Sequence, residues 1–253
     1  MFRKRNHLKI LCGVFASIVL TIPSLAQSNR PSPESTDTSV IAVVLGKNIT
    51  AKEKENLNGL IFGALLDKFS KEQDIAPNDD ELDTFVIKTE EIEKQENVRL
   101  ERDRERLRKE LKSSSMSDQE RKEKKSWLQN IESILKTKTE IKAQAGVSEE
   151  QKREMNLQIA RQFVKSWKIN KSLFEKYGGR VIFQQAGVEP LDAYRQFLKE
   201  QEKNGAFRII DKKYEAGFWR YFINDSMHTF YQGDDGAKFL KTPWWMMEKP
   251  SEE

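Results

Sequence analysis

The sequence predicts a mainly α-helical protein with one short β-hairpin near its N-terminus. Apolar residues recur at helical spacing through most of the chain, and four N-terminal capping motifs precede these stretches. The β-branched run at residues 40–45 lies shortly before the first capping motif and favours a strand. We expect the hairpin and its first helices to be followed by a long charged helical hairpin and a helical, aromatic C-terminal region.

The first 26 residues have the pattern of a secretory signal peptide. Four basic side chains precede or flank an apolar stretch at residues 10–22, and Ser24, Leu25 and Ala26 form a small-x-small cleavage site. The apolar stretch is too short for a spanning helix. We expect cleavage between Ala26 and Gln27 and a periplasmic or secreted mature chain, with an uncleaved anchor as the alternative.

Removal of this segment restricts the chemistry open to the chain. Cys12, the only cysteine, and His7 lie within it, and without its four basic residues the formal charge of +4 falls to zero. The mature chain can then form no internal disulfide and no Cys-based metal site. Its neutral balance gives no support for binding to nucleic acid or to anionic membranes through net charge.

Residues 27–39 are rich in Ser, Pro, Thr and Asn and predict a flexible linker. Residues 40–87 predict the first folded unit, in which a strand turns at Gly46 and Lys47 and returns through residues 48–50. Thr50 and Glu53 form a capping box before an apolar helix that extends to residue 69. Pro77 ends this pattern, and a second capping box follows at residues 78–81.

The order of these signals resembles the N-terminal chaperone domain of SurA- and PrsA-type envelope folding factors. That family typically shows a V-V-N-G-x-x-I-T hairpin, a long apolar helix and an A-K-E-x-G-I segment, where this chain has V-V-L-G-K-N-I-T and S-K-E-Q-D-I. Leu45 stands where the family usually has Asn, and Asp74 stands where it usually has Gly. The resemblance covers about a fifth of the chain and implies a protein that binds unfolded envelope polypeptides.

Residues 88–146 predict a charged helical hairpin inserted into the domain. Acidic and basic residues alternate around a few leucines at helical spacing, the serines at 113–115 interrupt the helix, and Ser117 with Glu120 begins a second one. An exposed or partly disordered segment is the alternative. The family often carries a parvulin-type prolyl isomerase domain at this place, and its glycine-rich turns and histidines are absent from this stretch, so the resemblance implies a folding factor without that domain.

Residues 147–253 are expected to complete the helical core. Ser148 and Gln151 begin a helix with an aromatic stripe, and the glycines at 178 and 179 end it. Pro190 begins a helix at residues 191–203, and Asp211 begins a further one. In the SurA-type fold a helix from beyond the insertion packs back on the first helices. The resemblance therefore implies that the helix at residues 149–177 does so, which would make the domain discontinuous.

No residues with the spacing of a catalytic or metal site stand out. His228 is the one histidine after residue 26 and no G-x-S-x-G motif is present, so the sequence indicates neither a histidine-activated serine nucleophile nor a zinc site. Glu189 and Asp192 are interpreted as partners of a helix dipole near Pro190. We assign no catalytic, cofactor-binding or metal-binding residue and expect no cofactor.

The expected function is non-catalytic binding of unfolded or nascent envelope proteins. The candidate peptide-binding residues are Leu57, Ile61, Trp167, Trp219, Trp244 and Trp245. Two alternatives stay open, a divergent peptidyl-prolyl cis-trans isomerase and a scaffold protein that uses the charged hairpin as a coiled-coil contact. We expect no nucleic-acid partner and no integral membrane segment after signal cleavage, and the sequence leaves the client and the oligomeric state open.

Overall fold

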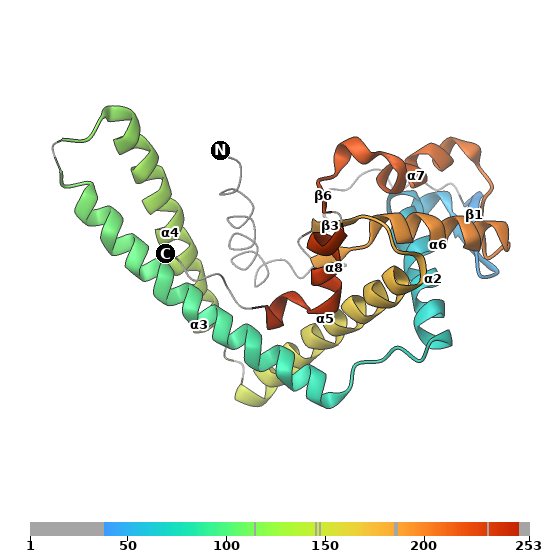
Figure 1. Cartoon of the computed structure of the whole chain (residues 1–253), viewed down its shortest axis with the longest axis horizontal. Coiled ribbons are helices and arrows are strands. Elements are labelled where there is room, and N and C mark those ends of the chain that lie inside the picture. The colour runs from blue at the N-terminus through green and yellow to red at the C-terminus, as the bar shows by residue number, and fades with distance from the viewer. Residues whose placement is uncertain are drawn as a thin grey trace. The chain divides into compact units, whose positions relative to one another are not determined.

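A computed structural model describes residues 38–247 except 114, 145, 147, 185, 186 and 232. For residues 141–144 it describes the backbone but not the surroundings of the side chains. The expected signal peptide and nearly all of the 27–39 linker lie outside these residues. The structure confirms the mainly helical class with a short N-terminal sheet (Figure 1).

Most described residues belong to helices. The α-helices are α2 (Leu57–Glu72), α3 (Asp79–Glu110), α4 (Asp118–Gln144), α5 (Glu149–Tyr177), α6 (Leu191–Lys203), α7 (Glu215–Ile223) and α8 (Gly233–Lys241). The strands are β1 (Val40–Val44), β2 (Lys47–Thr50), β3 (Val181–Gln184), β4 (Gly187–Glu189), β5 (Phe207–Ile209) and β6 (Phe230–Tyr231). Short 3-10 helices are η1 (Ala51–Asn56), η2 (Lys212–Tyr214), η3 (Asp225–Met227) and η4 (Trp244–Met246).

The described chain divides into two compact units. The hairpin unit contains residues 83–158, and the core unit contains the described residues up to 82 and from 159 onward. Helix α3 runs without interruption through residue 87, where the first folded unit was expected to end. No helix among the described residues is both long and apolar enough to cross a membrane.

The turn of the N-terminal hairpin lies one residue earlier than predicted. Leu45 and Gly46 connect β1 to β2 with φ angles of 49° and 77°, and Lys47 already pairs with Val44 in the ladder. Positive φ at both central residues is the requirement of the type I′ turn, whose twist matches that of the flanking strands. The predicted turn at Gly46 and Lys47 is therefore wrong by one position.

Capping motifs begin the long helices. The Asn78 N–H donates to Glu81 Oε2 at 2.8 Å, and the Glu81 N–H donates back to Asn78 Oδ1 at 2.8 Å. Equivalent pairs of bonds begin α4 and α5. At Thr50 the N–H and the hydroxyl both donate to Glu53, and the 3-10 helix η1 precedes α2. These bonds satisfy backbone donors that a helix start leaves without partners.

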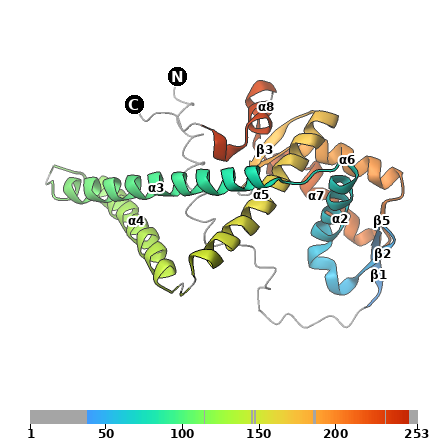
Figure 2. The same cartoon turned by 90° about the horizontal axis from the view of Figure 1, so that it is seen from below.

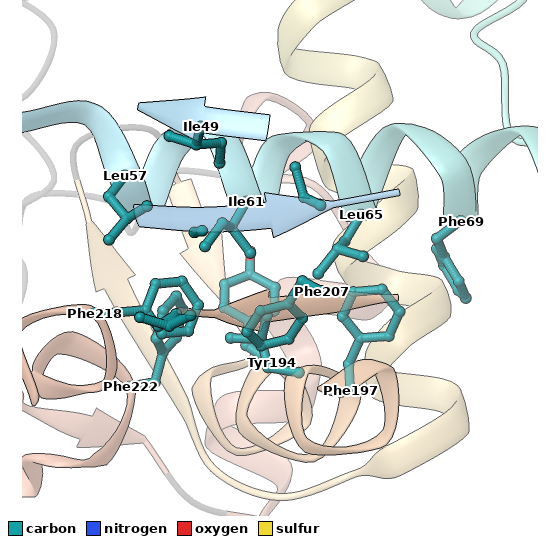
Figure 3. Packing of buried hydrophobic residues seen from close by; sticks show 14 of the residues in the cluster. Ile49, Leu57, Ile61, Leu65, Phe69, Tyr194, Phe197, Phe207, Phe218 and Phe222 are labelled. Carbon is teal, nitrogen blue, oxygen red and sulfur yellow. The ribbon is translucent and has the colours of Figure 1, made fainter. Parts of the chain in front are cut away.

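The core unit buries one large apolar cluster between segments that are far apart in the sequence. Ile61 and Leu65 of α2 face Tyr194, Phe197 and Phe207 (Figure 3). Strand β5 completes an antiparallel sheet of order β2-β1-β5 beside α2 (Figure 2). Full burial of each such side chain stabilises the fold by about 1.5–3 kcal/mol, so this cluster is the main source of stability in the unit.

Helix α5 contributes to the same cluster from beyond the charged segment. Ile169 and Leu173 are buried in it. Two lysines of α5 hold its surface to the segment around α2, because Lys165 pairs with Asp67 at 2.9 Å and Lys168 pairs with Glu81 at 2.9 Å. The core unit is therefore built from both sides of residues 83–158.

In the hairpin unit α3 and α4 pack through a narrow apolar seam. Leu100, Leu107 and Ile131 are buried there. Ion pairs link the two helices on either side, with Arg108 bound to Glu132 at 2.6 Å and Lys124 to Glu110 at 2.7 Å. Since the apolar residues of the two helices cover each other, their seam is already occupied within one chain.

Candidate functional site

Two of the candidate peptide-binding residues lie inside the core. Leu57 is 4% exposed and Ile61 is 0% exposed, and both belong to the cluster around Phe207 and Phe218. A peptide can contact only accessible atoms, so the assignment of Leu57 and Ile61 is wrong for this conformation. Helical spacing identified them as one apolar face of α2, and that face packs against the protein itself.

Three candidate tryptophans gather in a second cluster. The ring centroids of Trp167 and Trp245 lie 6.1 Å apart, and those of Trp244 and Trp245 lie 5.4 Å apart. Trp245 is 5% exposed, which also removes it from the binding surface, whereas Trp167 and Trp244 are half-buried. The Trp167 Nε1–H donates to the Phe239 carbonyl at 3.2 Å, so its polar edge has a structural partner.

Trp219 belongs to a different place, on helix α7. Its ring packs edge-on against Phe218 at 5.2 Å, and the Asn58 side chain donates to the Phe218 carbonyl at 3.0 Å, which joins α7 to α2. Trp219 is half-buried, and Ile223, one helical turn further, is 54% exposed. Residues at i and i+4 share one face of a helix, so the two form an accessible apolar strip.

Met227 follows this strip in η3 and is 49% exposed. We call Trp219, Ile223 and Met227 the α7 surface. Sequence analysis found Trp219 but missed Ile223 and Met227. The available signal for Ile223 was its spacing of four residues from Trp219, out of phase with the buried Phe218 and Phe222, whereas Met227 lies beyond the end of α7 and had no such signal.

A half-buried polar group lies between β4, α7 and the segment after η3. The Tyr221 hydroxyl donates to Glu189 Oε2 at 2.5 Å, and His228 Nε2 lies 2.8 Å from the Tyr221 carbonyl oxygen. Burial raises the pKa of Glu189, although the Tyr221 hydrogen bond and the His228 charge oppose this shift. Glu189 ends β4 and bonds Tyr221, so its interpretation as a helix-dipole partner is wrong.

A buried pair lies beside this group. The Tyr194 hydroxyl donates to Asn170 Oδ1 at 2.6 Å, and the Asn170 amide donates to the Val188 carbonyl at 2.8 Å. Burial and the nearby negative charge of Glu189 raise the pKa of Tyr194 well above its ordinary value. A carboxyl group with a raised pKa beside tyrosines is an arrangement that acid–base catalysis uses, but here the hydroxyl groups bond neighbouring protein atoms.

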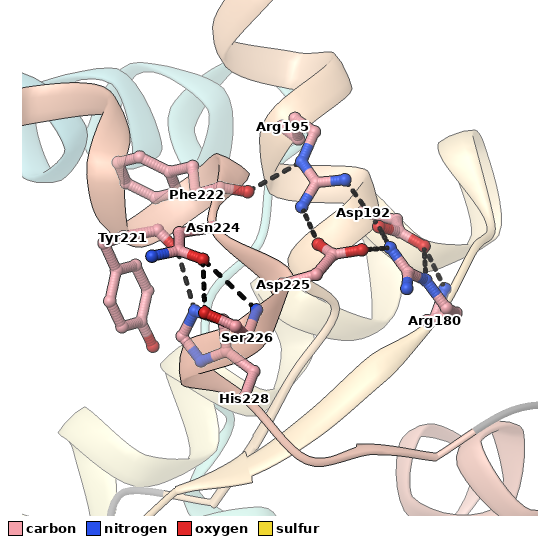
Figure 4. A network of polar contacts seen from close by, with 9 residues as sticks. All are labelled: Arg180, Asp192, Arg195, Tyr221, Phe222, Asn224, Asp225, Ser226 and His228. Atoms are coloured by element: carbon pink, nitrogen blue, oxygen red, sulfur yellow. Dashed lines mark hydrogen bonds and ion pairs between the residues drawn. The ribbon is translucent and has the colours of Figure 1, made fainter. Parts of the chain in front are cut away.

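Four charged residues form a network between the start of β3, the first two turns of α6 and η3 (Figure 4). Arg180 bonds Asp192 through Nε at 2.8 Å and Asp225 through Nη2 at 2.9 Å. Arg195 bonds Asp225 at 2.7 Å and donates to the Phe222 carbonyl at 2.6 Å. Burial alone would raise the pKa of Asp192, but hydrogen bonds from Arg180 and the charges of both arginines lower it.

Comparison of the chain with protein-family models, with curated proteins and with solved structures gives no match. Within the described ranges, no group of three or more His, Cys, Asp or Glu side chains is placed to hold a metal ion. The site therefore has to be judged from its own geometry, in which accessible apolar side chains and internally bonded polar groups are the main features.

Proposed function

We propose that this chain is a non-catalytic folding factor of the cell envelope whose core unit is a SurA-type chaperone domain. It is exported by the segment at residues 1–26, cleaved between Ala26 and Gln27, and binds unfolded polypeptides through the α7 surface. The charged hairpin takes the place of the isomerase domain that the family often carries.

The backbone at two positions supports the family assignment most directly. Leu45 and Asp74, with φ angles of 49° and 50°, are the residues other than glycine that have positive φ in the described part of the chain. They are also the two positions where the sequence departs from the family, which has Asn and Gly there. Asn and Gly are the residues that favour positive φ, so the backbone keeps a conformation suited to the family residues.

The discontinuous core is the second support. In the SurA-type fold a helix from beyond the insertion packs on the first helices, and here Ile169 and Leu173 of α5 share a buried cluster with Ile61 and Leu65 of α2. This arrangement requires residues 83–158 to leave the core unit and return to it.

The α7 surface supports the binding role. Exposed apolar side chains that gather on a surface often mark sites that recognise other polypeptides, and Ile223 at the end of α7 and Met227 in η3 are both about half exposed. The prolyl isomerase alternative has its best support in Glu189 and Tyr221, but the Tyr221 hydroxyl is bonded to the Glu189 carboxylate.

Suppression of aggregation tests the binding role. The chain should keep a chemically denatured model protein soluble after dilution, and the double variant Ile223→Ser/Met227→Ser should lose most of this effect. Val98→Ser/Met155→Ser is the matched control, because it removes two exposed apolar side chains from the hairpin unit. Equal activity of the two double variants would contradict the α7 assignment.

Two further measurements separate the alternatives. A prolyl peptide should isomerise at its uncatalysed rate, on the order of tens to hundreds of seconds, and clear acceleration would favour the isomerase instead. Mass spectrometry of protein from its native host should find Gln27 at the N-terminus, and an intact Met1 in the cytoplasm would contradict export.

A further inference from the structure

Positive charge is concentrated at one end of the hairpin unit. Residues 102–125, which we call the hairpin tip, comprise the end of α3, the connection and the start of α4, and they contain ten basic and six acidic side chains. The remaining residues of the 83–158 unit contain eight basic and eleven acidic side chains. The near-neutral total charge of the chain therefore hides a local excess where α3 and α4 meet (Figure 1).

Several basic side chains of the tip stabilise the hairpin itself. Arg121 donates to the carbonyls of Leu111 and Ser113 at 2.8 and 2.7 Å, which satisfies acceptors at the end of α3. Four other basic side chains of the tip form ion pairs with acidic side chains of the hairpin unit: Arg104–Glu101, Arg106–Asp103, Arg108–Glu132 and Lys124–Glu110. These residues have structural roles and are not available to a partner without loss of those bonds.

Four lysines of the tip have no such role. Lys109, Lys112, Lys122 and Lys125 are exposed, and none of their side-chain ammonium groups forms a hydrogen bond or ion pair with another described residue. Lys122 and Lys125 lie near the N-terminal end of α4, whereas the helix dipole favours basic side chains at the C-terminal end. Helix stability therefore does not explain these two lysines. Their ammonium groups are thus free to meet an external anion.

We propose that the hairpin tip binds the surface of an anionic phospholipid bilayer. Several free lysines at one end of a helical hairpin can approach a flat layer of phosphate groups together, within the screening length of about 8 Å. Trp127 is 46% exposed, but the Arg106 guanidinium lies 5.6 Å from its ring centroid and a residue two positions from Lys125 points to another side of α4, so the lysines carry the contact. The contact is peripheral and needs no spanning helix.

Vesicle binding tests this proposal. The chain from Gln27 onward, which retains every described residue, should bind vesicles of phosphatidylglycerol and phosphatidylcholine in a sedimentation assay, and binding should weaken as salt is raised. Changing Lys109, Lys112, Lys122 and Lys125 to Gln should weaken binding about fivefold for each lysine and several hundredfold in total. The same four positions changed to Arg should retain it.

The control removes the same charge from exposed positions outside the tip, by changing Lys94, Lys136, Lys152 and Arg153 to Gln. This variant should keep most of the binding, and circular dichroism should show that both variants keep their helices. Equal loss in the two variants, equal binding to pure phosphatidylcholine, or tighter binding to soluble heparin than to anionic vesicles would each overturn the proposal.

Discussion

Relief of backbone strain at Leu45 should stabilise the core unit. Leu45 occupies the left-handed region with φ of 49°, and an L-residue there costs roughly 1–2 kcal/mol relative to its preferred conformations. Leu45→Asn recovers part of this cost, because Asn tolerates the conformation. Leu45 is 38% exposed, and its N–H bond to the Ala206 carbonyl is kept in the variant, so little else is lost.

We expect Leu45→Asn to raise the free energy of unfolding by about 0.5–1 kcal/mol, which corresponds to a rise of roughly 1–4 °C in Tm for a chain of this size. Urea denaturation followed by tryptophan fluorescence measures this. A Trp127→Phe background restricts the signal to the core unit, because the other four tryptophans lie there.

The control is Leu45→Ala, which shortens the exposed side chain but keeps the Cβ atom that makes the left-handed conformation unfavourable. It should give no gain. If Leu45→Asn fails to stabilise the core unit, or if Leu45→Ala stabilises it equally, the strain argument and the support it gives to the family assignment are refuted.

Four other changes test the packing and the polar networks. Asp192→Ala should cost about 3 kcal/mol, because two guanidinium groups lose hydrogen bonds. The lowered pKa of Asp192 means that its contribution is present above its ordinary value of 3.8 and is lost as the pH falls further, so the variant should show a flatter acid limb in its stability profile. The effect of Glu189 on the pH dependence of stability has the opposite sign, because its pKa is raised: the stability it contributes is present below pH 4.5 and is lost as the pH rises through the raised value. Glu189→Gln should therefore abolish this dependence of the unfolding free energy on pH in urea titrations, and an unchanged dependence would contradict the assignment. Gly236→Ala should cost about 1–3 kcal/mol, since a Cβ there would lie 2.8 Å from a Val181 methyl carbon and 2.9 Å from the Tyr231 carbonyl oxygen. Gly63→Ala, whose added carbon meets nothing within 4 Å apart from its chain neighbours and the backbone of α2 itself, should instead stabilise α2 by about 0.5–1 kcal/mol, and a loss at Gly63 would contradict this comparison.

Local signals in the sequence were sufficient to place most helices. The predicted helices at residues 149–177 and 191–203 are confirmed with the same bounds, because a capping pair or Pro190 begins each and glycine follows each end. Helix α3 is longer than the separate segments that were expected, since neither Gly nor Pro interrupts residues 79–110.

Elements that depend on distant partners were not predictable in the same way. Strand β5 has three residues, and its ladder partner β1 lies more than a hundred residues earlier. So short a strand has little propensity signal of its own, because cross-strand packing decides it. Helix α8 was also missed, since Gly233 and Gly236 weaken its helical pattern.

The candidate site was predictable only in part. Periodicity showed that Leu57 and Ile61 lie on one face of a helix but could not show that β5, α6 and α7 cover that face. Glu189 and Tyr221 are 32 residues apart, and no local pattern relates a carboxylate to a hydroxyl at that distance. Which aromatic residues remain accessible is therefore a property of the tertiary packing.

Direct binding of an unfolded polypeptide tests the central claim most directly. Fluorescence anisotropy of a labelled, permanently unfolded model protein should rise as the chain is added, and the same protein in its native form should give no change. The Ile223→Ser/Met227→Ser variant should bind the unfolded protein at least about tenfold more weakly, while Val98→Ser/Met155→Ser should bind it as the unaltered chain does. Absence of binding to the unfolded protein, or equal binding to its native and unfolded forms, would contradict the assignment of this chain as a folding factor.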